Sequence, residues 1–418
     1  MERYAEYKES GVEWIGLLPV DWKTTRVRFL CDIATGDKDT VNREDDGAYP
    51  FYVRSPNIER INTFTFDGEA VLTAGDGVGA GKVFHYVNGK FDYHQRVYNL
   101  HNFRRVIGRF LFYFMQENFY KEIERGNAKS TVDSIRLPML QDFVIAHPQT
   151  ENEQEQVVEY IDRCTTEIDY LIADFQSQAE MLDRYKRELI ANTITHGLDK
   201  SVSTKDSGVD WIGEVPTHWD VTKTKWIFEI VKRIYGKEDR DVLSITQRGL
   251  KVRDLESNEG QLAESYANYQ VVNVNDFAMN SMDLLTGWVD CSPFEGVTSP
   301  DYRVFRFFPK KQQCHNYYKY LFQMCYKSRI FYRLGQGVSN LGRWRLQADQ
   351  FLNMKLPQPP VHEQEEIAAF LDKKTVQVDG LITDINDQIE KLKQYRQIVI
   401  HDAVTGKIKV SEEQGYGS

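Results

Sequence analysis

The 418-residue sequence predicts an α+β protein of two mixed α/β domains, related by pseudo-two-fold symmetry and joined by two long helices that form an antiparallel coiled coil. An internal repeat is the first reason: the pattern Ser-Gly-Val-x-Trp-Ile-Gly-x-x-Pro-x-x-Trp occurs at 10–22 and again at 207–219. The second reason is a Glu-Gln-Glu triplet at 153–155 that recurs at 363–365, each time opening a long helical pattern. Such specific residues at matched spacing indicate a tandem duplication.

The repeats set the expected domain boundaries. We expect a first globular domain at 1–150, a central helical region with its linker at 151–203, a second globular domain at 204–360, and a C-terminal helical region with a tail at 361–418. A chain of this length can bury a full core in each globular domain. Its hydrophobic content of 41% is typical of folded proteins.

Both long helices show apolar residues in alternating steps of four and three, which is the spacing of a coiled-coil seam. The predicted seam consists of Val157, Ile161, Ile168, Leu171, Gln178 and Leu182 in the first helix, and of Ile367, Leu371, Val378, Leu381, Gln388 and Leu392 in the second. A glutamine at the same seam position in both copies is expected to help fix the register. Thr150 and Glu153 predict a capping box at the first helix start, and Pro359-Pro360 excludes an earlier start of the second.

A seam from 157 to 189 is about 50 Å long at about 1.5 Å per residue. If the halves are related by an approximate two-fold axis, the helices run antiparallel and hold the globular domains apart. The separation is then comparable with one turn of DNA, about 34–36 Å. The alternative is that the helices only dimerise the protein.

In the first globular domain, residues 69–73 predict a strand that ends in the glycine-rich stretch 75–82. This stretch does not fit a phosphate-binding Walker loop, because Asp76 and Val83 stand where such a loop needs a glycine and a hydroxyl. A glycine-rich hairpin close to a DNA backbone is the preferred interpretation.

In the second globular domain, residues 276–280 predict a strand and residues 297–302 a turn. Aromatic helical patches at 110–114 and 317–322 are expected in the cores rather than as platforms for stacked bases. A polar stretch followed by Arg-Leu, at 129–137, recurs at 338–346. This second repeat predicts either a shared DNA loop or a shared hinge into the helix.

The net charge of −10 at first argues against nucleic acid, but the distribution of charge matters more. The stretches 151–190 and 361–408 hold the whole deficit. By contrast, residues 80–136 carry ten bases and five acids, and residues 303–355 carry eleven bases and one acid. One basic segment in each half predicts a phosphate-binding surface, unless these charges are scattered over solvated faces.

Composition and missing motifs exclude several classes. No run of about 18 apolar residues and no apolar signal-peptide core occurs, so we expect a cytoplasmic protein without a membrane segment. Five cysteines without a CxxC pair argue against a zinc site or a disulfide framework. The sequence has no adenine-methylation motif, Walker loop, paired-acid nuclease pattern or HExxH. We expect no catalytic residue, metal or cofactor in the chain itself.

The repeated motif at 10–22 and 207–219, together with Leu-Pro-Gln-Pro-Pro at 356–360, resembles the DNA-specificity (S) subunits of type I restriction–modification systems. Leu72-Thr73, the run from Gly79 to Val83 and Ser299-Pro300-Asp301-Tyr302 resemble core elements of that family's target-recognition domains. The resemblance covers essentially the whole chain. It implies two target-recognition domains that read the halves of a bipartite, asymmetric site in double-stranded DNA. It also implies a non-catalytic chain that docks two adenine-N6 methyltransferase (M) subunits, which use S-adenosylmethionine, and restriction (R) subunits, which need ATP and Mg.

Candidate DNA-binding residues follow from loop chemistry, with arginine expected on guanine and asparagine or glutamine on adenine. They are Lys82, Gln95, Arg96, Lys129, Ser130 and Thr131 in the first domain, and Asn280, Ser299, Tyr302, Ser339, Asn340 and Arg343 in the second. Two alternatives stay open: a coiled-coil adaptor that binds proteins without DNA specificity, and an enzyme whose catalytic centre leaves no recognisable motif.

Overall fold

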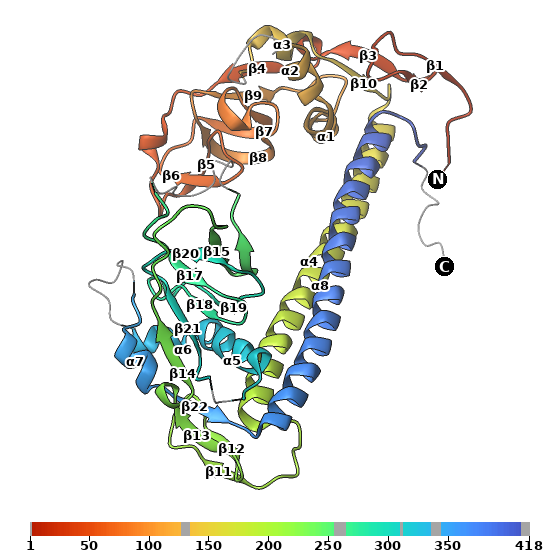
Figure 1. Ribbon diagram of the computed structural model, residues 1–418. Coiled ribbons are helices and arrows are strands. Elements are labelled where there is room, and N and C mark those ends of the chain that lie inside the picture. Colours follow the sequence, from red (N-terminus) through yellow and green to blue (C-terminus); the bar gives the residue numbers. More distant parts are fainter. Residues whose placement is uncertain (1, 127–133, 255–264, 310–311, 336–343, 411–418) are drawn as a thin grey trace. The chain divides into compact units, whose positions relative to one another are not determined.

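The structure is a computed structural model that describes residues 2–126, 134–254, 265–309, 312–335 and 344–410 (Figure 1). The chain forms two compact units: unit 1 is Met1–Gln176 with Asn386–Ser418, and unit 2 is Ser177–Ile385. Both units contain segments of the two long helices α4 (Glu151–His196) and α8 (Val361–Val404). Helix α8 begins directly after Pro359-Pro360, as predicted.

Unit 1 has a strand-rich globular part. Its strands are β1 (Tyr7–Glu9), β2 (Leu17–Pro19), β3 (Lys23–Arg26), β4 (Asp32–Thr35), β5 (Tyr49–Tyr52), β6 (Ile58–Ile61), β7 (Phe66–Ala74), β8 (Phe84–Tyr93), β9 (Val97–His101) and β10 (Val144–His147). Six of them form one sheet in the order β4-β9-β7-β8-β5-β6, antiparallel except for the β5–β8 pair. The strand predicted at 69–73 lies within β7, which confirms that prediction.

In its described residues, unit 1 also has three short α-helices and three 3-10 turns. They are α1 (Gly108–Asn118), α2 (Tyr120–Gly126) and α3 (Leu137–Asp142), with 3-10 turns η1 (Val27–Phe29), η2 (Thr40–Asn42) and η3 (Gly77–Gly79). Helix α1 packs against β7 and β8 (Figure 1). Its aromatic patch is core, as predicted, because Phe110, Leu111 and Phe114 are fully buried.

Unit 2 repeats the plan with shorter strands. These are β11 (Thr204–Asp206), β12 (Glu214–Pro216), β13 (Asp220–Lys223), β14 (Phe228–Val231), β15 (Leu243–Thr246), β16 (Gly249–Val252), β17 (Gln270–Val272), β18 (Phe277–Met279), β19 (Val289–Cys291), β20 (Gly296–Thr298), β21 (Arg303–Phe307) and β22 (Lys355–Gln358). The main sheet has the order β14-β21-β18-β19. The turn predicted at 297–302 is wrong at its start, because Val297 and Thr298 pair with β17 in β20.

The helical elements of unit 2 complete the correspondence. They are η4 (Thr224–Trp226), α5 (His315–Lys327), α6 (Ile330–Leu334) and α7 (Ala348–Asn353). The aromatic patch of α5 is again core, because Tyr317, Tyr318 and Phe322 are fully buried.

The last tryptophan of each repeated motif connects its globular part to a long helix by a hydrogen bond. In unit 1 the indole Nε1 of buried Trp22 donates to Glu153 Oε1 at 2.9 Å, and in unit 2 Trp219 Nε1 donates to Glu363 Oε2 at 2.9 Å. Thr150 Oγ1 accepts from the Glu153 backbone N–H at 3.3 Å, so half of the predicted capping box is present. The Glu153 carboxylate does not complete the capping box, because it accepts the hydrogen bond from Trp22.

The glutamine of each Glu-Gln-Glu triplet forms a second anchor. Gln154 Oε1 accepts from the Ile107 N–H, where α1 begins, at 2.9 Å. Gln364 Oε1 accepts from the Cys314 N–H, where α5 begins, at 3.0 Å. The first residues of a helix lack intrahelical acceptors for their N–H groups, so this bond joins two helix starts with one side chain. The duplication thus preserves the joint between domain and helix.

The two long helices run antiparallel in each unit. Arg396 of α8 pairs with Asp169 of α4 in unit 1, Nε to Oδ1 3.0 Å, and Lys186 of α4 pairs with Asp379 of α8 in unit 2, Nζ to Oδ1 2.5 Å. The spacing between Asp169 and Lys186 along α4 equals the spacing between Arg396 and Asp379 along α8, and the two helices run in opposite directions. The residues of α4 and α8 are therefore paired in the same register in both units.

The predicted seam is wrong at four of its members, Leu171, Gln178, Leu381 and Gln388. Of its members, Leu171 is 48% exposed, Leu381 is 52% exposed and Gln388 is exposed. The inward row passes instead through the next residue, such as Ile172 and the buried Ile389. That row, read from burial, is 161, 165, 168, 172, 175, 179 and 182 in α4, and 371, 375, 378, 382, 385, 389 and 392 in α8. Gln178 is half-buried beside it rather than on it. The remaining predicted members are buried or half-buried: Val157, Ile161, Ile168, Leu182, Ile367, Leu371, Val378 and Leu392.

Candidate nucleic-acid interface

The glycine-rich stretch of unit 1 forms the hairpin loop between antiparallel strands β7 and β8, as predicted. The backbone N–H groups of Lys82 and Val83 both donate to Gly79 O, at 3.0 and 2.9 Å. The loop is packed closely at its base, because a Cβ at Gly79 would lie 2.2 Å from the Arg54 carbonyl oxygen. The Lys82 side chain at its end is exposed.

A polar network joins this loop to the β8–β9 turn. Asp76 lies between two cations, with Arg54 Nη1 3.0 Å from Oδ1 and Arg96 Nε 3.8 Å from Oδ2. The Gly75 N–H donates to Arg96 O at 2.7 Å. Because the Arg96 side chain stays 66% exposed and Gln95 is exposed beside it, both can contact a ligand.

The segment that leads into α3 completes this cluster. The Ile135 backbone N–H donates to Gly75 O at 2.8 Å, and Ser134 forms an isolated antiparallel β-bridge with Asp76. Six of the predicted DNA contacts precede such a segment and lie outside the described residues: Lys129, Ser130, Thr131, Ser339, Asn340 and Arg343.

Unit 2 builds its loop on the same backbone bond. The Leu346 N–H donates to Ser281 O at 3.0 Å, just after β18, as Ile135 does to Gly75 after β7. Asn280 holds this loop: its Oδ1 accepts from Met282 N–H at 3.2 Å, and its carbonyl oxygen accepts from the Tyr326 hydroxyl at 2.6 Å. Asn280 is half-buried, and its side-chain oxygen is already hydrogen-bonded within the loop.

Ser299 and Tyr302 lie at the sheet end from which the Asn280 loop emerges, since β21 pairs with β18 and begins beside its end. Their carbonyl oxygens accept from the buried Gln270 Nε2 at 2.8 and 2.7 Å. Both side chains are half-buried. Of the predicted contacts in unit 2 that the structure describes, all three thus gather at one end of the sheet.

Two arginines of these clusters were not among the residues predicted from the sequence. Arg54 reaches Asp76 from the end of β5, across a long-range parallel pairing. Arg303 is largely buried and donates to Leu346 O at 2.7 Å. Burial lowers the pKa of Arg303 to about 10, so the side chain remains charged near neutral pH. It positions the Leu346 segment, while the neighbouring Arg345 is exposed.

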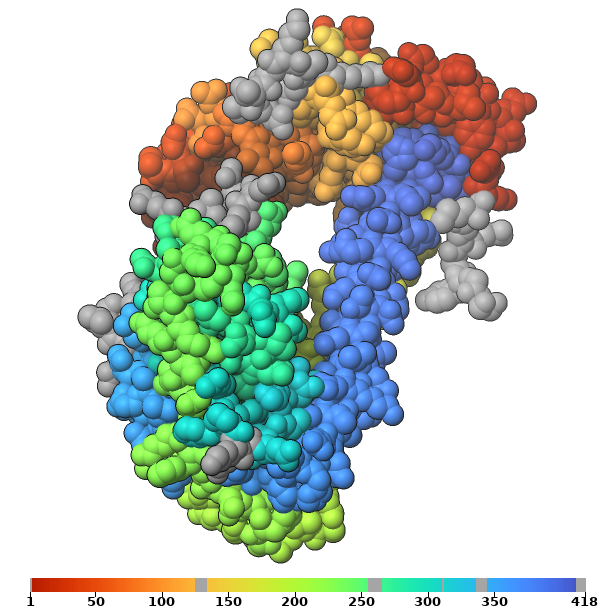
Figure 2. All heavy atoms as spheres, viewed as in Figure 1, coloured from red at the N-terminus to blue at the C-terminus, as the bar shows by residue number. Residues whose placement is uncertain are grey.

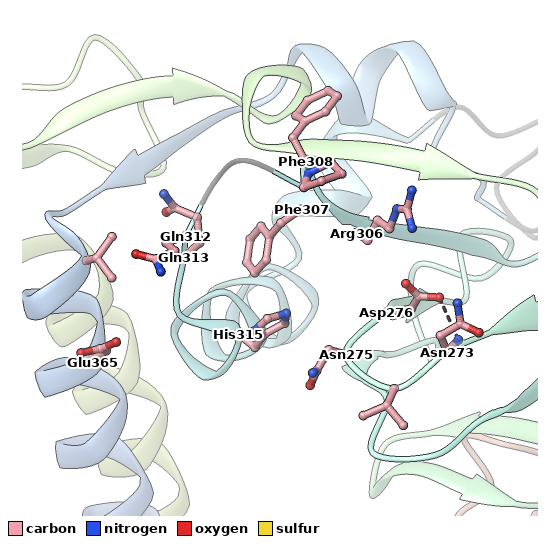
Figure 3. Close-up of a pocket in the computed structure, with 13 residues that line it drawn as sticks. Asn273, Asn275, Asp276, Arg306, Phe307, Phe308, Gln312, Gln313, His315 and Glu365 are labelled. Carbon is pink, nitrogen blue, oxygen red and sulfur yellow. Dashed lines mark hydrogen bonds between the residues drawn. The ribbon is translucent and has the colours of Figure 1, made fainter.

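A hollow in each unit borders the domain surface. In unit 1 a hollow of about 560 Å³ is lined by Arg54, Pro56, Asp76 and Val78, next to the hairpin loop. In unit 2 a hollow of about 600 Å³ lies at the opposite end of β18 and β21 from the Asn280 loop (Figure 3). Its polar lining includes Asn273, Asn275, Arg306, His315 and Glu365, and none of the predicted contacts belongs to it.

Comparison with known proteins places these features in a family. A model of the type I restriction modification DNA specificity domain matches residues 19–174 and 219–391, one match in each half. The chain belongs to the type I restriction–modification DNA specificity family. This confirms the expected duplication and the resemblance, and it does not support an adaptor without DNA specificity.

Members of the specificity family match nearly the whole chain. The type I restriction enzyme EcoDI specificity subunit of Escherichia coli is 21% identical over 94% of this chain and 90% of its own length. A solved structure described as the basis of complex assembly and conformational transition of the type I R-M system has a TM-score of 0.66 at 12% identity, covering 93% of this chain and 98% of that chain. The HsdS subunit from Thermoanaerobacter tengcongensis has a TM-score of 0.50 at 13% identity, with the same coverage. These likenesses confirm the mixed helix-and-strand fold class.

None of the helices in the described ranges combines the length and apolarity of a membrane span. Within those ranges, no group of three or more His, Cys, Asp or Glu side chains is arranged to hold a metal ion.

Proposed function

We propose that each unit reads one half of a bipartite DNA site through its loop cluster, and that α4 and α8 fix the spacer between the half-sites. The observation that carries this proposal is the matched backbone bond, Ile135 to Gly75 and Leu346 to Ser281, beneath loops of different sequence. A shared frame that displays different side chains suits two half-sites with different bases.

In unit 1, we assign base reading to Arg96 and Gln95, and phosphate contact to Lys82. Arginine binds guanine O6 and N7 with two parallel hydrogen bonds, whereas a single lysine ammonium suits a phosphate. In unit 2, Asn280, Ser299 and Tyr302 keep the role predicted for them. Contacts to bases discriminate between sequences by about 1–3 kcal/mol each, whereas phosphate contacts do not.

The test is sequencing of N6-methyladenine in a host that expresses this chain with its methyltransferase. One bipartite motif with a fixed gap, lost when the chain is deleted, is the expected result. Arg96→Ala should relax one half-site only. The matched control is Arg104→Ala, a 53% exposed arginine that pairs with Asp32 at the other end of the same sheet. Equal relaxation of both half-sites by Arg96→Ala would contradict the assignment.

We further propose that the helices dock two copies of one methyltransferase subunit, which brings S-adenosylmethionine, and that restriction subunits with ATP and Mg join this assembly. The chain itself is then non-catalytic. Support comes from apolar side chains that face solvent at equivalent positions of both helices. Leu171 and Tyr395, 48% and 44% exposed, lie at the same level in unit 1; Leu381 and Tyr185, 52% and 51% exposed, do so in unit 2.

Each of these Leu–Tyr pairs, with the same residue types, offers one copy of the same docking surface. Helix α8 is visible along much of its length in the space-filling view (Figure 2). Exposed apolar side chains that gather at one level of two neighbouring helices form a patch of the kind that marks an interaction site. A second copy of the same partner should therefore find the same two residues in the other unit.

The stoichiometry of the purified complex tests this docking. Tyr395→Glu should remove one methyltransferase copy, and Tyr395→Glu with Tyr185→Glu should remove both. The control is Tyr170→Glu, because Tyr170 is 73% exposed on α4 but lies off the Leu–Tyr row. Retention of two copies by the double variant would refute the docking surface without touching DNA reading.

A further inference from the structure

Each recognition loop carries an aliphatic side chain at its tip that packing does not explain. Val78, in the loop after β7, is 91% exposed, and Leu285, in the loop after β18, is 54% exposed. Single exposed apolar residues are common on protein surfaces. Here, however, the two residues occupy corresponding loops, which the matched backbone bonds to Gly75 and Ser281 identify.

Close packing and hydrogen bonds within each loop order the backbone beneath its tip. Beneath Val78, a Cβ at Gly79 would lie 2.2 Å from the Arg54 carbonyl oxygen, so only glycine fits there. Beneath Leu285, the Asp283 carboxylate accepts from the N–H groups of Leu285 and Thr286, both at 3.0 Å. A tip that is already ordered loses little conformational entropy when it binds a ligand.

Cationic side chains lie near the base of both loops. Arg54 and Arg96 flank Asp76, two residues before Val78. In unit 2 the exposed Arg345 precedes Leu346, which bonds to the base of the Leu285 loop. An apolar tip among cations suits DNA, because the cations bind phosphates while the tip reaches the bases.

We propose that Val78 and Leu285 each make an apolar contact with a base of their own half-site. The contact is either with a thymine methyl group or as a wedge between two stacked bases. This inference rests on the proposed DNA reading and adds a specificity determinant to each half-site. The side chains at the tips of these two corresponding loops differ, which suits contacts with two different sequences.

Binding of the methyltransferase complex to duplexes that carry its motif tests the inference. Val78→Ala should weaken binding to the motif duplex by about five- to thirtyfold and binding to an unrelated duplex by less than twofold. Leu285→Ala should act on the other half-site. The matched control is Val376→Ala, at a 72% exposed valine of α8.

Modified duplexes separate the two kinds of contact. If one thymine-to-uracil change weakens the wild type but not Val78→Ala, the tip reads that methyl group. If 2-aminopurine fluorescence rises with the wild type but not with Val78→Ala, the tip is a wedge. Either result supports the inference.

Affinity within twofold of wild type for both Val78→Ala and Leu285→Ala, while Arg96→Ala still weakens binding, would overturn this inference alone. Equal weakening of binding to motif and unrelated duplexes would also overturn it. If the wild-type complex shows no sequence-specific binding, the proposed function fails as well.

Discussion

Replacing the buried amide of Gln154 by leucine should loosen the joint between the first recognition domain and its helix. Gln154 is 1% exposed. Its Oε1 accepts from Ile107 N–H at 2.9 Å, and its Nε2 donates to the carbonyl oxygens of Arg105 and Pro148 at 2.9 and 3.1 Å. Leucine fills a similar volume but leaves one N–H and two carbonyl groups without a partner.

Each buried polar group left without a hydrogen bond costs about 1–3 kcal/mol. Gln154→Leu should therefore lower the free energy of unfolding of unit 1 by about 3–5 kcal/mol, less than the simple sum because groups in one network are not additive. Against a typical domain stability of about 5–15 kcal/mol, this is a large loss. Gln364→Leu should do the same to unit 2, where Gln364 is fully buried with corresponding bonds.

Urea unfolding of the full chain, followed by tryptophan fluorescence, measures the loss, because Trp22 and Trp219 report on different units. Gln176→Leu, at an exposed position of α4, is the matched control and should change stability by less than about 0.5 kcal/mol. A Gln154→Leu loss below about 1 kcal/mol, or one equal to that of the control, would refute the anchoring role of the amide.

Three further predictions concern stability. Burial raises the pKa of Glu117 to about 7, so the folded chain binds more protons than the unfolded chain between about pH 4.5 and 7, and stability falls as pH rises through that window. Glu117→Gln should abolish this fall and stabilise unit 1 at pH 8 by about 1–2 kcal/mol, discounted for partial exposure, with little gain at pH 4.5; melting curves at both values check it. Gly81→Ala should cost about 2–4 kcal/mol in thermal unfolding, because φ is +68° and a Cβ would meet Ile123 Cδ1 at 2.0 Å, whereas Gly77→Ala, at φ +74° in open space, should cost about 1 kcal/mol. Trp219→Phe should cost about 2–4 kcal/mol in urea unfolding through the lost bond to Glu363, and an unchanged midpoint would contradict that bond.

The elements that local patterns specify were accessible from the sequence. The strand at 69–73, the glycine hairpin after it and the start of α8 behind Pro359-Pro360 each follow from neighbours in the chain. The role of Glu153 was not accessible in this way. Its carboxylate accepts from Trp22, 131 residues away, and a capping pattern cannot reveal such a partner.

The candidate site shows the same division. Arg96 was a candidate from loop chemistry, which expects arginine on guanine, and the structure brings it to the hairpin loop. Arg54 did not, because it reaches Asp76 only through the parallel pairing of β5 with β8, which no local signal announces. The hairpin loop was predictable from neighbouring residues, whereas the backbone bond that matches Ile135 with Leu346 and the side-chain networks across distant strands were not.

The misplaced seam follows from a limit of periodicity. A row of apolar residues at heptad spacing identifies a face of a helix, but it does not say what covers that face. Leucine and tyrosine recur at 171 and 185 and again at 381 and 395, yet all four are about half exposed. At 171 and 381 the helix pair instead closes on the next residue, 172 and 382. Packing within the chain does not require apolar residues at these exposed positions in both halves. A partner that bound once to each half would require the same apolar residues in both. Contact with two different DNA sequences would instead favour different residues in the two halves, as at Val78 and Leu285.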